Sequence, residues 1–367
     1  MSLDRSRRRI LIVGAGPTGL TLALELARHG FHPEIVDKKA EPSQLSRAVG
    51  INPRSLELLE PSGLTSKLIE AGLRLDGIMI FDGQERVGRL RFSLLHHRYN
   101  FLLSLPQNRT EELLVGQIAD YGIQVRWNTE IETLDIDIEG VEANYTDGHC
   151  EGLFEYVIGC DGVGSAVRRT AGIAFPGSEQ PTQWSVADCY VKGSLEDLAY
   201  AHLHALADGT AFFTVPIGRD RVRAVCSRPD VSERLQGFKL DHIARTGEFT
   251  VQVRQADTYR RGPIFLAGDA AHCHSPAGGR GMNLGIGDAC VLANCLTEGR
   301  LKDYQLIRHP AGTMALKQSE RLSALATMTG TLGRRGRNRL LGMATHMPLL
   351  ERRLVYRNLS GLGEKNL

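Results

Sequence analysis

The first forty residues alternate between short apolar runs and one longer apolar segment with helical spacing. Residues 9–13 form a β-branched apolar run, residues 18–29 repeat leucine and alanine up to Gly30, and residues 33–37 form a second short run. Apolar runs of about four to eight residues fit buried strands, whereas the longer segment fits a helix. The pattern therefore predicts a βαβ unit, which implies a parallel sheet covered on both faces.

Farther along the chain the spacing of apolar residues changes. In residues 77–92 and 212–226 it approaches a period of two on either side of turn residues, which predicts antiparallel hairpins. The region 180–255 therefore predicts a second domain built on a mostly antiparallel sheet. Residues 282–296 and 301–367 have helical composition.

Composition and charge narrow the classes of function. The 367 residues allow about two domains, and 42% hydrophobic with 23% charged residues is an ordinary globular balance. A net charge of +2 gives no sign of a nucleic-acid-binding protein. The seven cysteines include no C-x-x-C pair, which argues against metal sites and a disulfide framework and favours a reducing, cytoplasmic location.

The amino-terminal segment has some features of a signal peptide but lacks an uninterrupted apolar stretch. Arg7, Arg8 and Arg9 precede the first apolar run, but Glu25 and Arg28 interrupt the apolar stretch that follows. No stretch of the sequence approaches the about 18 apolar residues that a membrane span needs. We therefore expect neither export nor a membrane span.

The segment 331–367 is strongly basic. It contains eight basic and two acidic residues, together with apolar residues at helical spacing, namely Leu340, Leu341, Met343, Leu349, Leu350 and Leu354. One interpretation is a helical cap packed on the body of the protein, and the other is a weak contact with an anionic membrane surface or a partner. We favour the cap, because amphipathic helices usually bury their apolar face against their own core.

A glycine-rich turn follows the first predicted strand. The segment GAGPTG, residues 14–19, fits G-x-G-x-x-G, in which the glycines permit a sharp turn, close approach of a pyrophosphate and tight packing of helix on strand. The helix that follows presents its positive end to phosphate groups. Asp37 ends the next strand and can accept hydrogen bonds from a ribose. The motif in this context predicts a dinucleotide site.

Two further glycine loops follow apolar runs. The first is GCDGVG, residues 159–164, after the run 154–158. The second is GDAAHCHSPAGGRGMN, residues 268–283, after the run 263–267. In the second, Asp269 can bind sugar-alcohol hydroxyls, and backbone N–H groups near Gly281 can face a negative centre with the helix dipole behind them.

The three segments together resemble one family. GAGPTG with Asp37, GCDGVGSAVRR, and GDAAHCHSPAGGRGMNLGIGDA are similar, in order and spacing, to the single-component FAD-dependent aromatic hydroxylases. These are the class A flavoprotein monooxygenases similar to para-hydroxybenzoate hydroxylase. The resemblance covers roughly residues 8–300 and implies an α/β fold, with a glutathione-reductase-type Rossmann FAD domain, an inserted, mostly antiparallel substrate domain and a C-terminal helical segment.

The resemblance also implies domain boundaries. The implied parts are a discontinuous FAD-binding domain of residues 1–75, 100–178 and 256–300, a substrate domain of residues 76–99 and 179–255, and a helical segment of residues 301–367. Within the last segment, Arg339-Leu340-Leu341-Gly342 and Pro348-Leu349-Leu350 are weakly similar to the helical end of ubiquinone-biosynthesis hydroxylases.

Residue by residue, the resemblance implies contacts with the cofactor. The first loop holds the pyrophosphate, Asp37 the ribose, and Asp269 the ribityl chain, while Arg47 lies near the flavin and the nicotinamide path. Pro276 lies in the loop that faces the flavin. The full cofactor-binding set that the resemblance implies is Gly14, Gly16, Pro17, Thr18, Gly19, Asp37, Lys38, Arg47, Gln107, Asp161, Gly162, Gly268, Asp269, Pro276, Gly281, Met282 and Asn283.

The implied reaction hydroxylates an aromatic or conjugated small molecule with NADPH or NADH and O₂, through a flavin C4a-hydroperoxide. The sequence contains one G-x-G-x-x-G segment, so a second Rossmann domain for the nicotinamide is not expected, and NAD(P)H would bind transiently across Arg47 and Asp161. FAD carries the chemistry, and the protein orients the reactants and excludes solvent.

Several alternatives stay open. The same scaffold can give epoxidation, Baeyer–Villiger insertion or reduction, and a flavin-binding module without turnover is a further reading. No catalytic base is named, because His202, His204, His272 and His274 are each more simply explained as structural histidines. The substrate, the regiochemistry, the choice of NADPH or NADH and the oligomeric state are also not set by the sequence.

Overall fold

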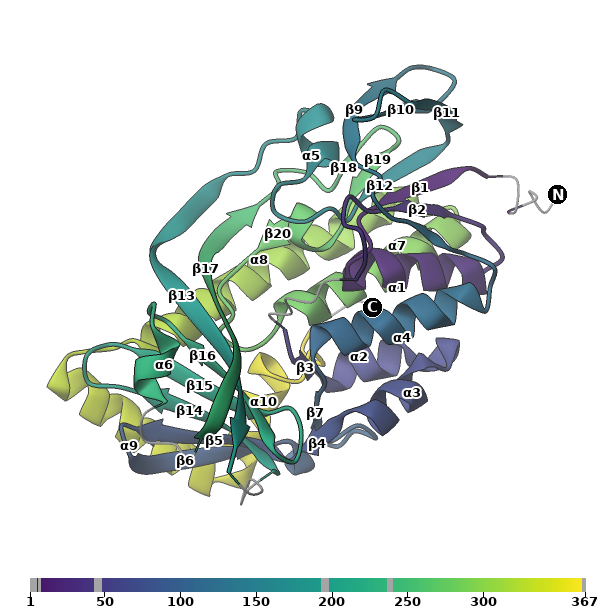
Figure 1. Cartoon of the computed structure of the whole chain (residues 1–367). Coiled ribbons are helices and arrows are strands. Elements are labelled where there is room, and N and C mark those ends of the chain that lie inside the picture. Colours follow the sequence, from purple (N-terminus) through teal and green to yellow (C-terminus); the bar gives the residue numbers. More distant parts are fainter. Residues whose placement is uncertain (1–4, 6–7, 43–47, 193–197, 236–239, 365–367) are drawn as a thin grey trace.

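The computed structural model describes residues 5, 8–42, 48–192, 198–235 and 240–364. Figure 1 shows one β-sheet and its helices at one end of the molecule and a second, larger sheet at the other. Two long strands, β13 (Gly177–Val191) and β17 (Leu240–Gln255), run between the two ends. This arrangement confirms the predicted α/β class with a second, mostly antiparallel sheet.

The first sheet has six strands in the order β18-β19-β12-β1-β2-β8, and all neighbours except β18 and β19 are parallel. Its strands are β1 (Ile10–Val13), β2 (Glu34–Val36), β8 (Val125–Arg126), β12 (Tyr156–Gly159), β18 (Arg260–Arg261) and β19 (Ile264–Leu266). Every residue of β1 and β19 is buried, as expected for a sheet that is covered on both faces.

Helix α1 (Pro17–Arg28) connects β1 to β2, which confirms the predicted βαβ unit. Pro17 suits the first turn of a helix, where its missing N–H costs no hydrogen bond. The chain leaves the helix at Gly30, whose φ of 83° is a left-handed conformation. The helix packs against α4 (Gln107–Ala119) and α7 (Gly281–Thr297).

The second sheet has eight strands in the order β20-β17-β13-β16-β15-β14-β5-β6. The remaining strands of this sheet are β5 (Gly77–Asp82), β6 (Glu85–Arg91), β14 (Tyr200–Ala205), β15 (Ala211–Pro216), β16 (Arg221–Cys226) and β20 (His272–Cys273). Both predicted hairpins are confirmed, as β5 with β6 and β15 with β16. Only β5 and β14 pair in parallel among its described strands.

Smaller elements complete the fold. The remaining strands are β3 (Gly50–Ile51), β4 (Leu73–Leu75), β7 (Leu102–Ser104), β9 (Ile131–Ile136), β10 (Val141–Tyr145) and β11 (Cys150–Phe154). The remaining short helices are α2 (Pro53–Leu58), α3 (Leu64–Ala71), α5 (Ala166–Thr170) and α6 (Val231–Arg234), with 3-10 turns at Glu60–Ser62, Phe92–Leu94 and Gly268–Ala270. The predicted domain boundaries stay a prediction.

Three helices form the last part of the described chain: α8 (Leu301–Ala326), α9 (Thr331–His346) and α10 (Pro348–Asn358). The preferred expectation that their apolar face packs on the body is wrong for Leu340, Met343, Leu349 and Leu350, which are exposed. The reason is that α9 attaches to β5 through polar contacts with Asp82, while α10 attaches through the ion pair of Glu351 with Arg91 and through Val355, which lies in a buried cluster with Phe92 and Leu95. Within the described ranges, we find no helix whose length and hydropathy would let it cross a membrane.

Candidate active site

The first glycine loop lies between β1 and α1. Gly14 has a φ of 106°, which favours glycine, and its N–H donates to the Val36 carbonyl over 2.7 Å. A Cβ atom on Gly19 would lie 1.9 Å from the Gly14 carbonyl oxygen, so a side chain cannot be placed there. A Cβ atom on Gly16 would meet no atom within 4 Å, and Gly16, Pro17 and Thr18 line a large cavity. The loop thus presents open backbone at a helix start, where an anion is stabilised.

Thr18 also joins this loop to the third glycine loop. Cβ atoms added to Gly268 and Gly285 would lie 2.5 and 2.2 Å from Thr18 Oγ1. Two loops that are about 250 residues apart in sequence therefore meet in direct van der Waals contact.

Asp37 lies at the end of β2 and is buried. Its carboxylate accepts hydrogen bonds from the N–H groups of Ala15 over 2.7 Å and Lys39 over 2.9 Å, so it also shapes the first loop. Lys38 is exposed, and its ammonium group lies 3.3 Å from Glu130 Oε1. Lys39 lines the cavity. A contact of Asp37 or Lys38 with a cofactor stays a prediction.

The second glycine loop follows β12. Asp161 Oδ2 accepts hydrogen bonds from the N–H groups of Ala166 over 2.7 Å and Val167 over 3.2 Å, at the start of α5. Its other oxygen, Oδ1, is buried and makes no hydrogen bond within the described part of the chain. Burial raises the pKa of Asp161 above its ordinary value. Asp161 therefore holds the loop, and its neighbours Gly162 and Val163 are the residues that line the cavity.

The third glycine loop runs from β19 to α7. Asp269 lies in the 3-10 turn Gly268–Ala270, three residues after the end of this strand, and its exposed side chain lines the cavity. Pro276, Gly281 and Met282 line it as well. The helix begins at Gly281, one residue before the predicted start. Because the first N–H groups of a helix have no partners within it, this end attracts negative charge.

The side chain of Asn283 fixes the start of α7. Its Oδ1 accepts a hydrogen bond from the Asn52 N–H over 2.9 Å. Its Nδ2 donates to the Gly50 carbonyl over 2.8 Å and to the Gly279 carbonyl over 2.9 Å. The amide is therefore engaged on both sides, which leaves the backbone of this turn as the part that can face a ligand.

Gln107 and Arg47 are predicted cofactor contacts that lie outside the three glycine loops. Gln107 is the first residue of α4 and lines the cavity, where its Nε2 donates to Glu111 Oε1 over 2.8 Å. Arg47 lies outside the described residues, while its neighbours Ala48, Val49 and Gly50 line the cavity.

Behind the third loop lies a buried network of charges that the sequence interpretation missed. Asp288 on α7 accepts hydrogen bonds from the Gly268 N–H over 2.9 Å and from Arg308 Nε over 2.6 Å, and His272 Nε2 lies 2.6 Å from its Oδ2. Glu364 lies 3.4 Å from Arg308. The available signal was an aspartate inside an otherwise apolar helix, since an acid is rarely buried without partners.

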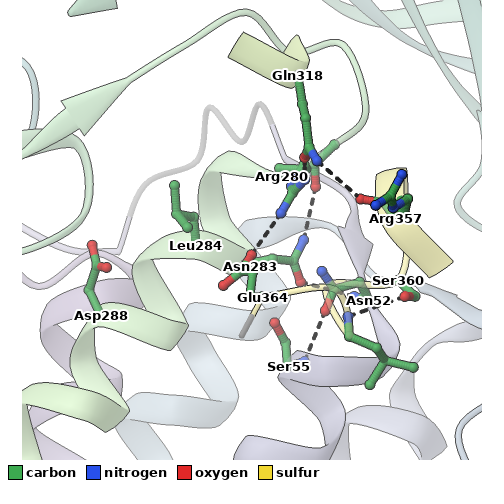
Figure 2. Close-up of polar contacts among 12 residues, drawn as sticks. Asn52, Ser55, Arg280, Asn283, Leu284, Asp288, Gln318, Arg357, Ser360 and Glu364 are labelled. Carbon is green, nitrogen blue, oxygen red and sulfur yellow. Dashed lines mark hydrogen bonds and ion pairs between the residues drawn. The ribbon is translucent and has the colours of Figure 1, made fainter. Parts of the chain in front are cut away.

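Glu364 connects this network to the start of α7, where Figure 2 shows Arg280, Gln318 and Glu364 close together. Arg280 pairs with Glu364 over 2.8 Å and donates to Gln318 Oε1, and all but 3% of the arginine is buried. Burial opposes ionisation of Asp288, but His272 and Arg308 hold its pKa below the ordinary value. The network therefore keeps an ionised carboxylate in the core and holds the third loop in place.

The three loops open into one cavity of about 2080 Å³. From the loops it extends across one face of the eight-stranded sheet, and residues of α8, α9 and α10 line it as well. Apolar residues from the strands dominate its far end, including Ile78, Ile80, Leu90, Trp184, Val186, Phe213, Val215, Val225, Phe249 and Val251. Such a cavity suits a large ligand with few charged groups.

A buried ion pair lies where the loops meet the large sheet. Arg223 is 1% exposed, and its Nε and Nη2 donate to Asp188 over 2.6 and 2.8 Å. Arg245 Nη2 donates to the same carboxylate over 2.7 Å. Burial opposes ionisation of Asp188, but the two arginines hold its pKa below the ordinary value. Asp188 therefore joins arginines on the two neighbouring strands of the sheet at the cavity wall.

The four histidines differ in position. His202 and His274 line the cavity, whereas His272 is buried against Asp288. His204 Nδ1 lies 2.9 Å from the Gly83 carbonyl. Burial lowers the pKa of His274 to about 4, so its imidazole is neutral at physiological pH.

Comparison with known proteins identifies the family. The family model described as "FAD binding domain" matches residues 7–246 and 237–319. Rifampicin monooxygenase from Streptomyces venezuelae is 33% identical over 333 residues, which span 84% of this chain and 69% of that protein. Pentachlorophenol 4-monooxygenase from Sphingobium chlorophenolicum is 34% identical over 76% of this chain, which spans only 56% of that protein.

The fold is also that of a solved structure. The crystal structure of p-nitrophenol 4-monooxygenase from Pseudomonas putida superposes with a TM-score of 0.89 at 21% identity, and covers 98% of this chain and all of that one. The match to the family model includes all three glycine loops. The chain therefore belongs to the FAD-dependent aromatic hydroxylases, the class A flavoprotein monooxygenases.

Proposed function

We propose that this chain uses NAD(P)H and O₂ to hydroxylate a large, mostly apolar aromatic compound. The cavity is the observation that supports this proposal most strongly, because it joins the glycine loops to an apolar sheet face within one volume of about 2080 Å³. Pockets for single drug-sized ligands have about 300–1,000 Å³, so this one is large enough for a dinucleotide and a second molecule together.

FAD fits the residues at the loop end of the cavity. Gly16 leaves open space beside the start of α1 for phosphate groups, and the exposed carboxylate of Asp269 can accept hydrogen bonds from hydroxyl groups. The start of α7 at Gly281 stabilises negative charge. Bound there, FAD supplies the electron transfer and oxygen activation that hydroxylation requires.

The far end of the cavity would hold the substrate. Apolar side chains from β5, β13, β15 and β17 surround it, and they exclude water from the space next to the loops. The pentachlorophenol enzyme has a phenol in its name, which supports an aromatic ring as the group that reacts here. We propose that size and low polarity, more than charge, select the substrate.

NAD(P)H would bind only transiently, because the sequence has a single G-x-G-x-x-G loop. We expect Asp161 to act by positioning Gly162 and Val163, since its carboxylate already binds the start of α5. In this proposal NAD(P)H approaches the cavity beside these two residues.

Steady-state oxidation of NADPH and NADH, measured with a set of fused-ring phenols, tests the function. We expect an effective phenol to stimulate oxidation by at least about tenfold and to gain one oxygen atom from isotopically labelled O₂. Stimulated oxidation that leaves the ligand unlabelled would contradict hydroxylation. Stimulation by no phenol, in a protein that retains FAD, would favour a flavin-binding module without turnover.

Asp269→Ala is expected to weaken FAD binding by about ten- to a hundredfold, because a hydrogen bond to a charged group contributes about 1.5–3 kcal/mol. The side chain is exposed, and thermal unfolding of the FAD-free variant reports any accompanying change in stability. Isothermal titration of FAD into the FAD-free protein measures the effect. Asp120→Ala, at an exposed acid at the end of α4, is the matched control. Equal affinity in all three proteins would contradict the proposed role of Asp269.

A further inference from the structure

Helices α9 and α10 expose apolar residues on the side that faces away from the sheet. Both helices pack on β6, where a Cβ atom on Gly88 would lie 2.6 Å from Thr345 Oγ1 and where Arg91 Nη2 lies 2.7 Å from Glu351. The opposite side is exposed, with exposed fractions of 83% for Leu332, 65% for Leu340 and 72% for Leu349. We call this side the outer face. It consists of Leu332, Arg335, Arg339, Leu340, Met343 and Met347 on α9 and Leu349, Leu350, Arg353 and Tyr356 on α10.

Helical geometry explains this separation. At 3.6 residues per turn, Leu332, Arg335, Arg339 and Met343 share one side of α9. The residues that hold α9 in place occupy the other side: Arg334 and Arg337 pair with Asp82, and Asn338 donates to its Oδ2 over 2.7 Å. The polar side therefore binds the protein, and the apolar side faces solvent. An amphipathic helix usually packs its apolar side on the protein and exposes its polar side, so α9 has the reverse orientation.

Charge on the two helices has one sign. Residues 331–358 contain seven arginines, and their only acid is Glu351, which is fully buried against Arg91. The exposed charges of the outer face are therefore arginines, at positions 335, 339 and 353. Apolar side chains among exposed arginines, without acids, are the pattern of helices that lie in the interface of an anionic membrane.

The outer face is continuous with the cavity. Leu350 and Arg353 are exposed and also line the cavity, next to Leu341, Ala344 and Leu354 from the inner sides of the same helices. A membrane against the outer face would thus lie beside the cavity wall.

We propose that the outer face of α9 and α10 docks on the surface of a bilayer that contains anionic lipid. The arginines bind the headgroups, and the leucine and methionine side chains enter the boundary with the acyl chains. The docking is reversible, because only a few side chains take part. It does not depend on which compound the site hydroxylates.

Vesicle co-sedimentation of the FAD-loaded protein tests this proposal. We expect binding to vesicles of equal parts phosphatidylcholine and phosphatidylglycerol, and no binding to vesicles of phosphatidylcholine alone. The double variant Arg335→Gln/Arg339→Gln should bind the anionic vesicles roughly twenty- to thirtyfold more weakly, since each basic residue near such a surface contributes about 1 kcal/mol. Leu340→Ser/Met343→Ser should weaken binding by at least about tenfold.

The control substitutions change an exposed apolar residue and an exposed basic residue that lie outside the outer face. Ile138, which is fully exposed between β9 and β10, and Lys67 on α3 lie outside the outer face, so Ile138→Ser and Lys67→Gln should bind like the unaltered protein. All variants should keep their FAD content, because none of the substituted residues lines the cavity. Failure to bind anionic vesicles, or equal binding by all variants, would overturn the proposal. So would a stable dimer that Leu340→Ser/Met343→Ser converts to monomers, because the face would then join two copies of this chain.

Discussion

Replacing Asp288 by alanine is expected to lower the free energy of unfolding by about 3–5 kcal/mol. The substitution leaves the guanidinium of Arg308 buried, and the more distant Glu364 is then its one charged partner among the described residues. It also removes the acceptor for the Gly268 N–H and for His272. Urea unfolding of the purified protein at neutral pH measures the change.

Two companion experiments separate the charge from the packing. If an unpaired buried cation causes the loss, Asp288→Leu/Arg308→Met should recover a large part of it, because replacing both partners by apolar residues removes the unpaired charge. The pKa of Asp288 is lowered in the folded state, so its contribution should be present at neutral pH and decline as the pH falls below about 4. An alanine variant as stable as the unaltered protein would refute this account of the network.

Gly16→Val is expected to lower the affinity for FAD at least about a hundredfold, without a comparable loss of stability. A Cβ atom at this position meets no protein atom within 4 Å, so the FAD-free fold accepts a side chain there. The added atoms would occupy the space in which the backbone approaches the pyrophosphate. Loss of two charge-assisted hydrogen bonds, at about 1.5–3 kcal/mol each, gives the stated factor.

Gly19→Val provides the contrast for this prediction. Its Cβ atom would lie 1.9 Å from the Gly14 carbonyl oxygen, so this variant should be less stable than the unaltered protein even without FAD. Flavin absorbance after purification and thermal unfolding of the FAD-free proteins distinguish the two effects. A Gly16→Val protein that retains the normal flavin content would show that the loop does not hold the pyrophosphate.

Local patterns predicted the elements well, and the glycine motifs predicted which loops meet at the cavity. Asp269 and Gly16 lie at the edge of the sheet that their loops predicted, because the loop after a parallel strand begins at the edge where that strand ends. The sequence did not reveal that Arg308 binds Asp288 or that Glu364 binds Arg280. These contacts join segments far apart in the chain, and no local periodicity encodes them.

For α9 and α10, the local pattern predicted the helices but not their orientation on the body of the protein. The spacing of Leu340, Met343 and Leu349 correctly predicted helices with an apolar side, but not which side would attach to the body. That choice depended on Asp82 and Arg91, whose partners lie about 250 residues away. Periodicity identifies a face, and the tertiary partners decide what the face contacts.

The contact of Thr18 with Gly268 and Gly285 has a consequence for biosynthesis. The first loop leaves the ribosome long before the third, and the parallel sheet between them needs strands from both ends of this span. Non-local contacts of this kind form late, because the intervening chain must first be ordered. A nascent chain therefore exposes the phosphate-binding turn before the surfaces that enclose FAD have been synthesised. We expect FAD to bind only once most of the polypeptide has left the ribosome.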